Sequence, residues 1–164
     1  MKVLKFGGSS VASSENIKKV INIIIATSKK QKIIVVVSAF GKTTNALIEG
    51  AHLAQNKNSG YKEIIQKLEK HHFNVIEELI PTEQQPTIVA HIKELFNQLE
   101  TIYKGCYLLE ELSPKTLATI SSFGELLSAS IIAEISNLKI DTIYKDSRDL
   151  IVASEMYLDA VVDF

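Results

Sequence analysis

The sequence predicts an α/β fold in three layers, α/β/α, built on a mainly parallel sheet. Three observations support this class. Residues 3–6 form a short apolar strand that ends in a glycine-serine turn, a helical pattern follows, and residues 33–37 are an unbroken β-branched run. Such a run is typical of a strand buried on both faces. A strand, a helix and a second strand in this order form a βαβ unit, whose two strands run parallel.

Composition indicates an ordinary globular protein of about one domain. The 164 residues are 46% hydrophobic, and 18 Lys and Arg stand against 19 Asp and Glu, for a net charge of −1. Since no basic block is present, we expect no nucleic-acid partner. The longest apolar runs, residues 23–26 and 33–37, are too short to cross a bilayer, so we expect no membrane association.

The N-terminus shows no signal-peptide pattern, and the single cysteine, Cys106, cannot form an internal disulfide. Both observations fit a reducing compartment and predict a cytoplasmic protein. Cys106 belongs to an apolar stripe at helical spacing, so we expect a core residue rather than a nucleophile.

The turn after the first strand is the first candidate site. Gly7 and Gly8 permit positive φ and have no Cβ, so their N–H groups could approach an anion closely, and Lys5 adds a positive charge beside them. This combination suits a phosphate group, whose transfer depends mainly on positioning and electrostatics. On these residues alone, a plain strand–helix turn with an exposed lysine is an equal alternative, because short Gly-Gly motifs are weak signals.

The second strand ends in a polar segment, residues 38–45, which contains the triplet GKT. A P-loop also needs a glycine five residues before that triplet, where this chain has Val36, inside the strand. The hydroxyls of Ser38 and Thr44 therefore indicate a polar loop at a helix start, where capping is their ordinary role. Because parallel strands end at one edge of a sheet, this loop should adjoin the glycine turn.

Apolar spacing predicts further elements along the chain. The first expected helix is capped by Ser13 or Ser14 and is about fifteen residues long. Further helices are expected over residues 47–56, 64–79, 86–109 and 114–120, and another resumes after residue 125 and ends at Asn137. Residues 121–125 interrupt the helical pattern, so Glu125 would open the last helix, where the helix dipole favours a carboxylate. We expect strands over residues 140–144 and 150–153 and no closing element at residues 161–164.

The four histidines give no indication of a metal site. His71 and His72 are adjacent on a helix and point about 100° apart, while His52 and His91 have no ligand-type residue at the i+4 position. We therefore expect surface or partly buried imidazoles and no protein-bound metal.

Three blocks of the sequence resemble aspartokinases, members of the amino-acid kinase family. The blocks are KFGGSSV at residues 5–11, VSA with KTTN within residues 37–45, and SFGEL with Ser128 within residues 122–128. They follow the family's order and approximate spacing. Ser9 stands where the family usually has threonine and keeps the hydroxyl. Residues 61–111 and 149–163 are more similar to the bifunctional aspartokinase–homoserine dehydrogenases.

The resemblance implies transfer of the ATP γ-phosphoryl group to the side-chain carboxylate of L-aspartate, the first step of lysine, threonine and methionine biosynthesis. Lys5 and Gly8 would be the catalytic residues, and Gly7 and Ser9 would join them in holding phosphate. The implied aspartate contacts are Ser38, Thr44 and Glu125. Magnesium would arrive with ATP. A homo-oligomer is expected.

In the family, a second half of the kinase domain carries most of the ATP pocket and an arginine that holds the substrate carboxylate. Residues 1–164 contain no match to this second half or to its arginine. The chain therefore resembles the N-terminal lobe of the kinase, and we expect it to be inactive alone. Apolar surface near residues 161–164 should then stay uncovered. Two alternatives remain open: another amino-acid kinase with a different acceptor, and a lobe that serves only binding or assembly.

Overall fold

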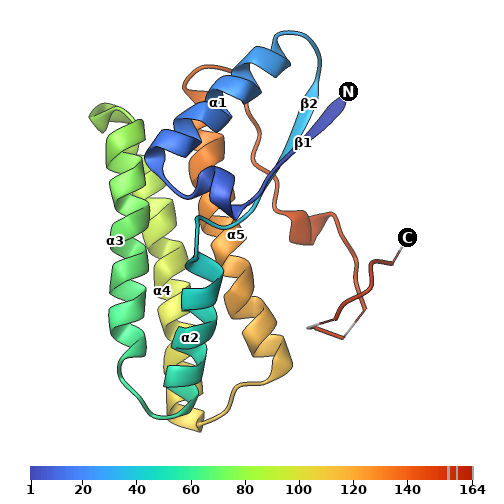
Figure 1. Ribbon diagram of the computed structural model, residues 1–164. Coiled ribbons are helices and arrows are strands. Elements are labelled where there is room, and N and C mark those ends of the chain that lie inside the picture. Colours follow the sequence, from blue (N-terminus) through green and yellow to red (C-terminus); the bar gives the residue numbers. More distant parts are fainter. Residues whose placement is uncertain (155, 158, 164) are drawn as a thin grey trace.

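The computed structural model describes every residue except Glu155, Leu158 and Phe164. In chain order its helices and strands are β1 (Lys2–Phe6), η1 (Gly8–Val11), α1 (Ser14–Ser28), β2 (Ile33–Val37), α2 (Thr43–Gln55), α3 (Tyr61–Leu79), η2 (Thr82–Gln84), α4 (Gln85–Leu109), α5 (Pro114–Asn137) and η3 (Ser147–Asp149). The long helices α2 to α5 lie side by side, with α1 and the strand pair above one end of the bundle (Figure 1).

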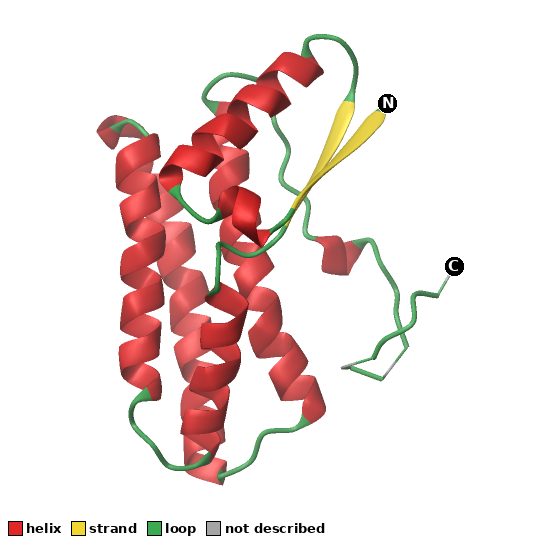
Figure 2. Ribbon diagram, in the orientation of Figure 1, coloured by secondary structure: helices red, strands yellow, loops and turns green. Residues whose placement is uncertain are grey.

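The two strands pair in parallel, which confirms the predicted βαβ unit (Figure 2). Lys2 lies opposite Ile33 and Phe6 opposite Val37, so both strands end at the same edge. Ser38 N–H continues the ladder by donating to the Phe6 carbonyl at 3.0 Å. The loops that follow the two strands are therefore neighbours, as the sequence predicts.

Only one face of the sheet is covered. Ile33, Val35 and Val37 pack against the core, whereas Val3, Ile34 and Val36 are 46–59% exposed. The β-branched run of β2 is thus buried on alternate residues and not on both faces as predicted. The described helices all pack on one side of these two strands, which leaves the other face open.

The helical bundle supplies most of the core. Helix α2 packs against α3, α4 and α5, and the buried Tyr103 hydroxyl of α4 donates to the Leu47 carbonyl of α2 at 2.7 Å. Burial raises the pKa of Tyr103 above its ordinary value, so the phenol keeps its proton for this bond. Cys106 is buried in the same core, as predicted, and burial raises the pKa of its thiol.

Helix α5 runs without a break through residues 121–125, where the sequence predicted an interruption. Ser121 and Ser122 donate their hydroxyls to helix carbonyls three and four residues earlier, and so do not compete with the helix. Glu125 therefore lies in mid-helix, and the expected stabilisation by a helix N-terminus does not apply. Among the described helices α5 alone is long and apolar enough to cross a membrane, but half of it is buried in the bundle, as in many core helices.

The predicted strand over residues 140–144 is not formed. Its first amides bond back to the end of α5, Ile140 N–H to the Ser136 carbonyl and Thr142 N–H to Asn137 Oδ1. A strand needs a paired neighbour, and these residues pair with none of the described strands. Residues 150–153 likewise form no strand beyond one bridge between Ala153 and Val162. Phe164, at the end predicted to stay uncovered, lies outside the described residues.

Candidate functional site

The turn after β1 opens into the short helix η1. Gly7 has φ −78°, an ordinary value, and a Cβ added there would meet nothing within 4 Å, so neither backbone conformation nor packing requires glycine at this residue. Gly8 is required by packing. A Cβ on Gly8 would lie 3.3 Å from the Gly41 carbonyl oxygen and 3.4 Å from that of Ala39. Gly8 thus permits close approach of the loop after β2.

The amides of Gly8 and Ser9 are free to bind an anion. Within the described part of the chain, no carbonyl or side chain accepts a hydrogen bond from either N–H group. The Ser9 carbonyl accepts instead from the Asn16 side chain at 3.1 Å, which fixes the turn to α1. Free N–H groups at the start of a helical turn are the donors that phosphate binding requires.

The loop from β2 to α2 closes over the same turn. Gly41 has φ +52°, in the left-handed region that favours glycine, and its N–H donates to the Gly8 carbonyl at 3.3 Å. The buried Thr43 hydroxyl donates to the Phe40 carbonyl at 2.7 Å, just as α2 begins. These two bonds set the path of residues 38–44 between η1 and α5 (Figure 1).

Helix α5 completes the arrangement from the other side of the loop. Ala39 N–H donates to Glu125 Oε1 at 3.2 Å, and the Ser128 hydroxyl donates to the Ser38 carbonyl at 2.8 Å. Gly124 allows this approach, since a Cβ there would lie 2.8 Å from the Ala39 Cβ and 3.3 Å from Thr44 Oγ1.

Three distant segments are thus assembled at one edge of the sheet. The segment from Ser38 to Thr44 lies between the other two and contacts both, the turn at Gly8 on one side and helix α5 with Glu125 on the other. Lys5 lies one residue before the last of β1, opposite Val36, on the open face of the sheet. The lysine is exposed and makes no ion pair with a described carboxylate.

The histidines divide into two kinds. His52 and His91 are exposed, as expected, but His72 is completely buried, contrary to the expectation of surface or partly buried imidazoles. No group of three or more His, Cys, Asp or Glu side chains in the described residues could hold a metal ion.

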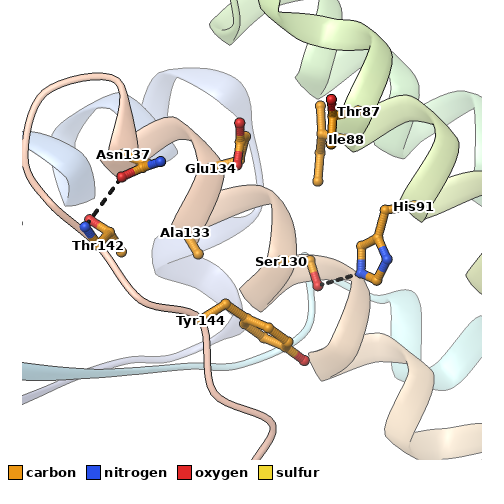
Figure 3. Close-up of a pocket in the computed structure, with 9 residues that line it drawn as sticks. All are labelled: Thr87, Ile88, His91, Ser130, Ala133, Glu134, Asn137, Thr142 and Tyr144. Carbon is orange, nitrogen blue, oxygen red and sulfur yellow. Dashed lines mark hydrogen bonds between the residues drawn. The ribbon is translucent and has the colours of Figure 1, made fainter.

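A hollow of about 220 Å³ lies elsewhere, between α4, α5 and the segment after α5 (Figure 3). His91 and Ser130 point toward each other across it, with His91 Nε2 and the Ser130 hydroxyl 3.3 Å apart. Tyr144 lies below them, and burial raises the pKa of its phenol. The hollow is lined by the C-terminal half of α5 and by neither Glu125, the turn at Gly8 nor the loop after β2.

The sequence matches a known family. The sequence profile of the amino acid kinase family fits residues 1–154. The chain belongs to the amino acid kinase family. This membership agrees with the small parallel sheet, the helices that cover it and the glycine turn at its edge.

The relatives found by sequence are aspartokinases. A bifunctional aspartokinase/homoserine dehydrogenase of Buchnera aphidicola is 33% identical over 99% of this chain and 20% of its own length. The chloroplastic aspartokinase 1 of Arabidopsis thaliana is 35% identical over 82% of this chain and 23% of its own length. The chain therefore spans about a fifth of the length of these relatives.

The fold is that of a solved aspartokinase. The structure of E. coli aspartokinase III in complex with aspartate and ADP superposes with a TM-score of 0.87 at 24% identity, over 99% of this chain and 35% of that protein. The same enzyme in complex with lysine and aspartate gives a TM-score of 0.84. These matches confirm the predicted amino-acid kinase fold.

Some residues that shape the site were not predicted from the sequence, because their side chains carry no polar or charged group. Gly41 appeared only as part of a GKT triplet, and Gly124 only as part of a supposed helix break. Phe40, buried in the middle of the loop, was not singled out either, although phenylalanine is among the residues most often fully buried, and this could have marked it.

Proposed function

We propose that this chain is the acceptor-binding lobe of an aspartate kinase, which transfers the γ-phosphoryl group of ATP to the side-chain carboxylate of L-aspartate to give 4-phospho-L-aspartate. The observation that carries this proposal is the contact of Glu125 with the loop that bears Ser38 and Thr44. The aspartokinase names of the sequence relatives support it, as does a solved structure of this fold with aspartate and ADP.

The residues suit the chemistry of this transfer. The acceptor carboxylate has an ordinary pKa near 3.9 and is ionised at neutral pH, so no general base is required. The reaction needs positive charge and N–H donors at the transferring phosphoryl group. Lys5 and the free amides of Gly8 and Ser9 would supply them, with Gly7 shaping the turn.

The three acceptor contacts would each bind a different group of L-aspartate or share its carboxylates. Glu125 would bind the α-ammonium group through the carboxylate that already orients Ala39 N–H. Ser38 and Thr44, on the same loop, would donate hydroxyls to the carboxylates. Magnesium would be held with the phosphates of ATP, whose negative charge it would screen.

We also propose that residues 1–164 do not phosphorylate aspartate at a useful rate alone. Donor and acceptor must be held in line, and this alignment is worth about 7–11 kcal/mol. The chain covers only 35% of the solved aspartokinase that it matches, so much of the donor side would come from other segments. We further propose that the whole enzyme is cytoplasmic and homo-oligomeric and serves lysine and threonine synthesis.

Trapping of the acyl phosphate tests this function. The lobe would be assayed with MgATP and hydroxylamine, alone and joined to the remaining two thirds of the E. coli aspartokinase III kinase chain. We expect aspartyl hydroxamate only from the joined protein and only with L-aspartate. Hydroxamate from L-glutamate or acetate instead would favour another amino-acid kinase, and none with any acceptor would favour a lobe for binding or assembly.

A further inference from the structure

The loop that carries the proposed acceptor contacts is anchored by an aromatic stack. Phe40, at the middle of the loop, is 1% exposed. Its ring stacks on that of His72 of α3, with centroids 5.2 Å apart and planes at 21°. Phe96 of α4 meets the same imidazole edge-on at 5.6 Å. The His72 imidazole of α3 thus lies between Phe40 of the loop and Phe96 of α4 and contacts both.

The orientation of this imidazole is fixed by its own helix. His72 Nδ1 lies 2.7 Å from the Leu68 carbonyl oxygen, and since a carbonyl can only accept, Nδ1 carries the proton. Nε2 is buried and has no partner among the described residues. The Nδ1–H bond holds the ring plane in the orientation in which it stacks on Phe40.

A purely space-filling role does not account for an imidazole here. Leucine or phenylalanine would fill the volume without burying an unpartnered nitrogen, which is unfavourable. Neither side chain has an N–H group that could donate to the Leu68 carbonyl and so fix its orientation. The imidazole offers a flat face for Phe40 together with a donor that fixes that face.

We propose that His72 is a positioning residue for the acceptor loop, acting through Phe40 on the Ala39 N–H that Glu125 binds. The inference rests on the proposed function, since it makes His72 a determinant of aspartate affinity. The contacts form a continuous path: His72 stacks on Phe40, the adjacent Ala39 donates to Glu125 at 3.2 Å, and the Phe40 carbonyl accepts from Thr43 at 2.7 Å.

Amide hydrogen exchange measured by NMR on the 164-residue chain tests the inference. The Ala39 amide reports the loop, and the amide of buried Ile131 in α5 reports global opening. In His72→Leu we expect the ratio of the Ala39 rate to the Ile131 rate to rise about tenfold, because local opening no longer has to break the stack. A merely structural role would speed both amides equally and leave the ratio unchanged.

Two variants keep the test independent of how well His72→Leu folds. Phe40→Leu removes the stack from the loop side and should raise the same ratio by a similar factor. His72→Phe keeps an aromatic face but loses the Nδ1–H donor, and should raise it less. Cys106→Ala is the matched control, because this buried residue of α4 lies in the core, and its loss should lower stability without changing the ratio.

L-Aspartate titration of the same samples separates this inference from the proposed function. Weaker aspartate binding in His72→Leu and Phe40→Leu, but not in Cys106→Ala, would support both. In a second case, the ratio of the Ala39 rate to the Ile131 rate rises in the variants, but aspartate does not bind even to the unaltered chain. This result would support the role of His72 in positioning the loop and would contradict aspartate as the substrate. An unchanged ratio in His72→Leu and Phe40→Leu would overturn the inference.

Discussion

Glu125 has two tasks at the level of single atoms. One carboxylate oxygen accepts from Ala39 N–H and so fixes the acceptor loop, while the side chain as a whole is exposed at the sheet edge. A carboxylate in this place can both order the loop and bind an ammonium group. Glutamine would keep an acceptor for Ala39 and lose the charge.

We therefore expect Glu125→Gln to weaken L-aspartate binding about tenfold or more, the scale for losing one member of a charge pair at a partly desolvated site. Binding of succinate, which has no ammonium group, should change little. Titration followed by NMR gives both affinities, and Glu134→Gln on the same helix is the control. Equal losses of affinity for aspartate and succinate would show that Glu125 does not bind the ammonium group.

His72 predicts how stability depends on pH. Burial lowers the pKa of its imidazole from 6.5 to about 4, so the folded chain keeps it neutral while the unfolded chain binds a proton below pH 6.5. The free energy of unfolding should then fall by about 3 kcal/mol as pH drops from 6.5 to 4.

Urea unfolding across this range measures the effect. His72→Phe should flatten the fall, because it removes the group that titrates, whereas His52→Phe, at an exposed site, should leave the slope as it is. A slope that persists in His72→Phe would assign the pH dependence to other groups.

At the level of elements, α5 shows why one side of the site was predictable and the other was not. The parallel pairing of β1 and β2 follows from their apolar runs and the helix between them, so the meeting of their loops could be foreseen. The course of α5 could not. Ser121, Ser122 and Gly124 are weak helix formers, and only tertiary contacts reveal that the glycine lets α5 touch Ala39.

This contact predicts opposite effects for two glycines in long helices. Gly124→Ala places a Cβ 2.8 Å from the Ala39 Cβ and should destabilise the chain by about 1–3 kcal/mol. Gly105→Ala, in α4 with open space around it, should stabilise by about 0.5–1 kcal/mol, the ordinary helix preference. Thermal unfolding compares them directly. Stabilisation by both would mean that α5 does not approach the loop so closely.

The strand predicted over residues 140–144 is absent for a reason that also depends on tertiary structure. Its β-branched and aromatic residues suit a strand, but pairing requires a free neighbouring edge in the right place, which local sequence cannot show. Ile140 packs against the core, whereas Ile143 is 82% exposed, so the segment buries only part of its apolar surface.

At the scale of the whole molecule, the open sheet face is the largest departure from prediction. Val3, Ile34 and Val36 form an exposed apolar face on two strands whose outer edges are unpaired within the described residues. Such edges and faces favour association. The isolated chain should therefore self-associate as its concentration rises.

Sedimentation velocity tests this expectation. The double variant Ile34→Thr with Val36→Thr keeps β-branched side chains and should shift the chain toward monomer. Leu108→Thr, which alters an apolar residue exposed on α4, is the control and should not. A monomeric unaltered chain at all concentrations would show that the open face does not drive association.

The assembly of the three segments into one acceptor site is tested most directly by an NMR titration of the 164-residue chain with L-aspartate. We expect the amides of Gly8, Ala39 and Glu125 to shift together with a single affinity, because Ala39 contacts both Gly8 and Glu125 at one sheet edge. Shifts confined to the hollow at His91 and Ser130, or no shifts at millimolar aspartate, would contradict the site.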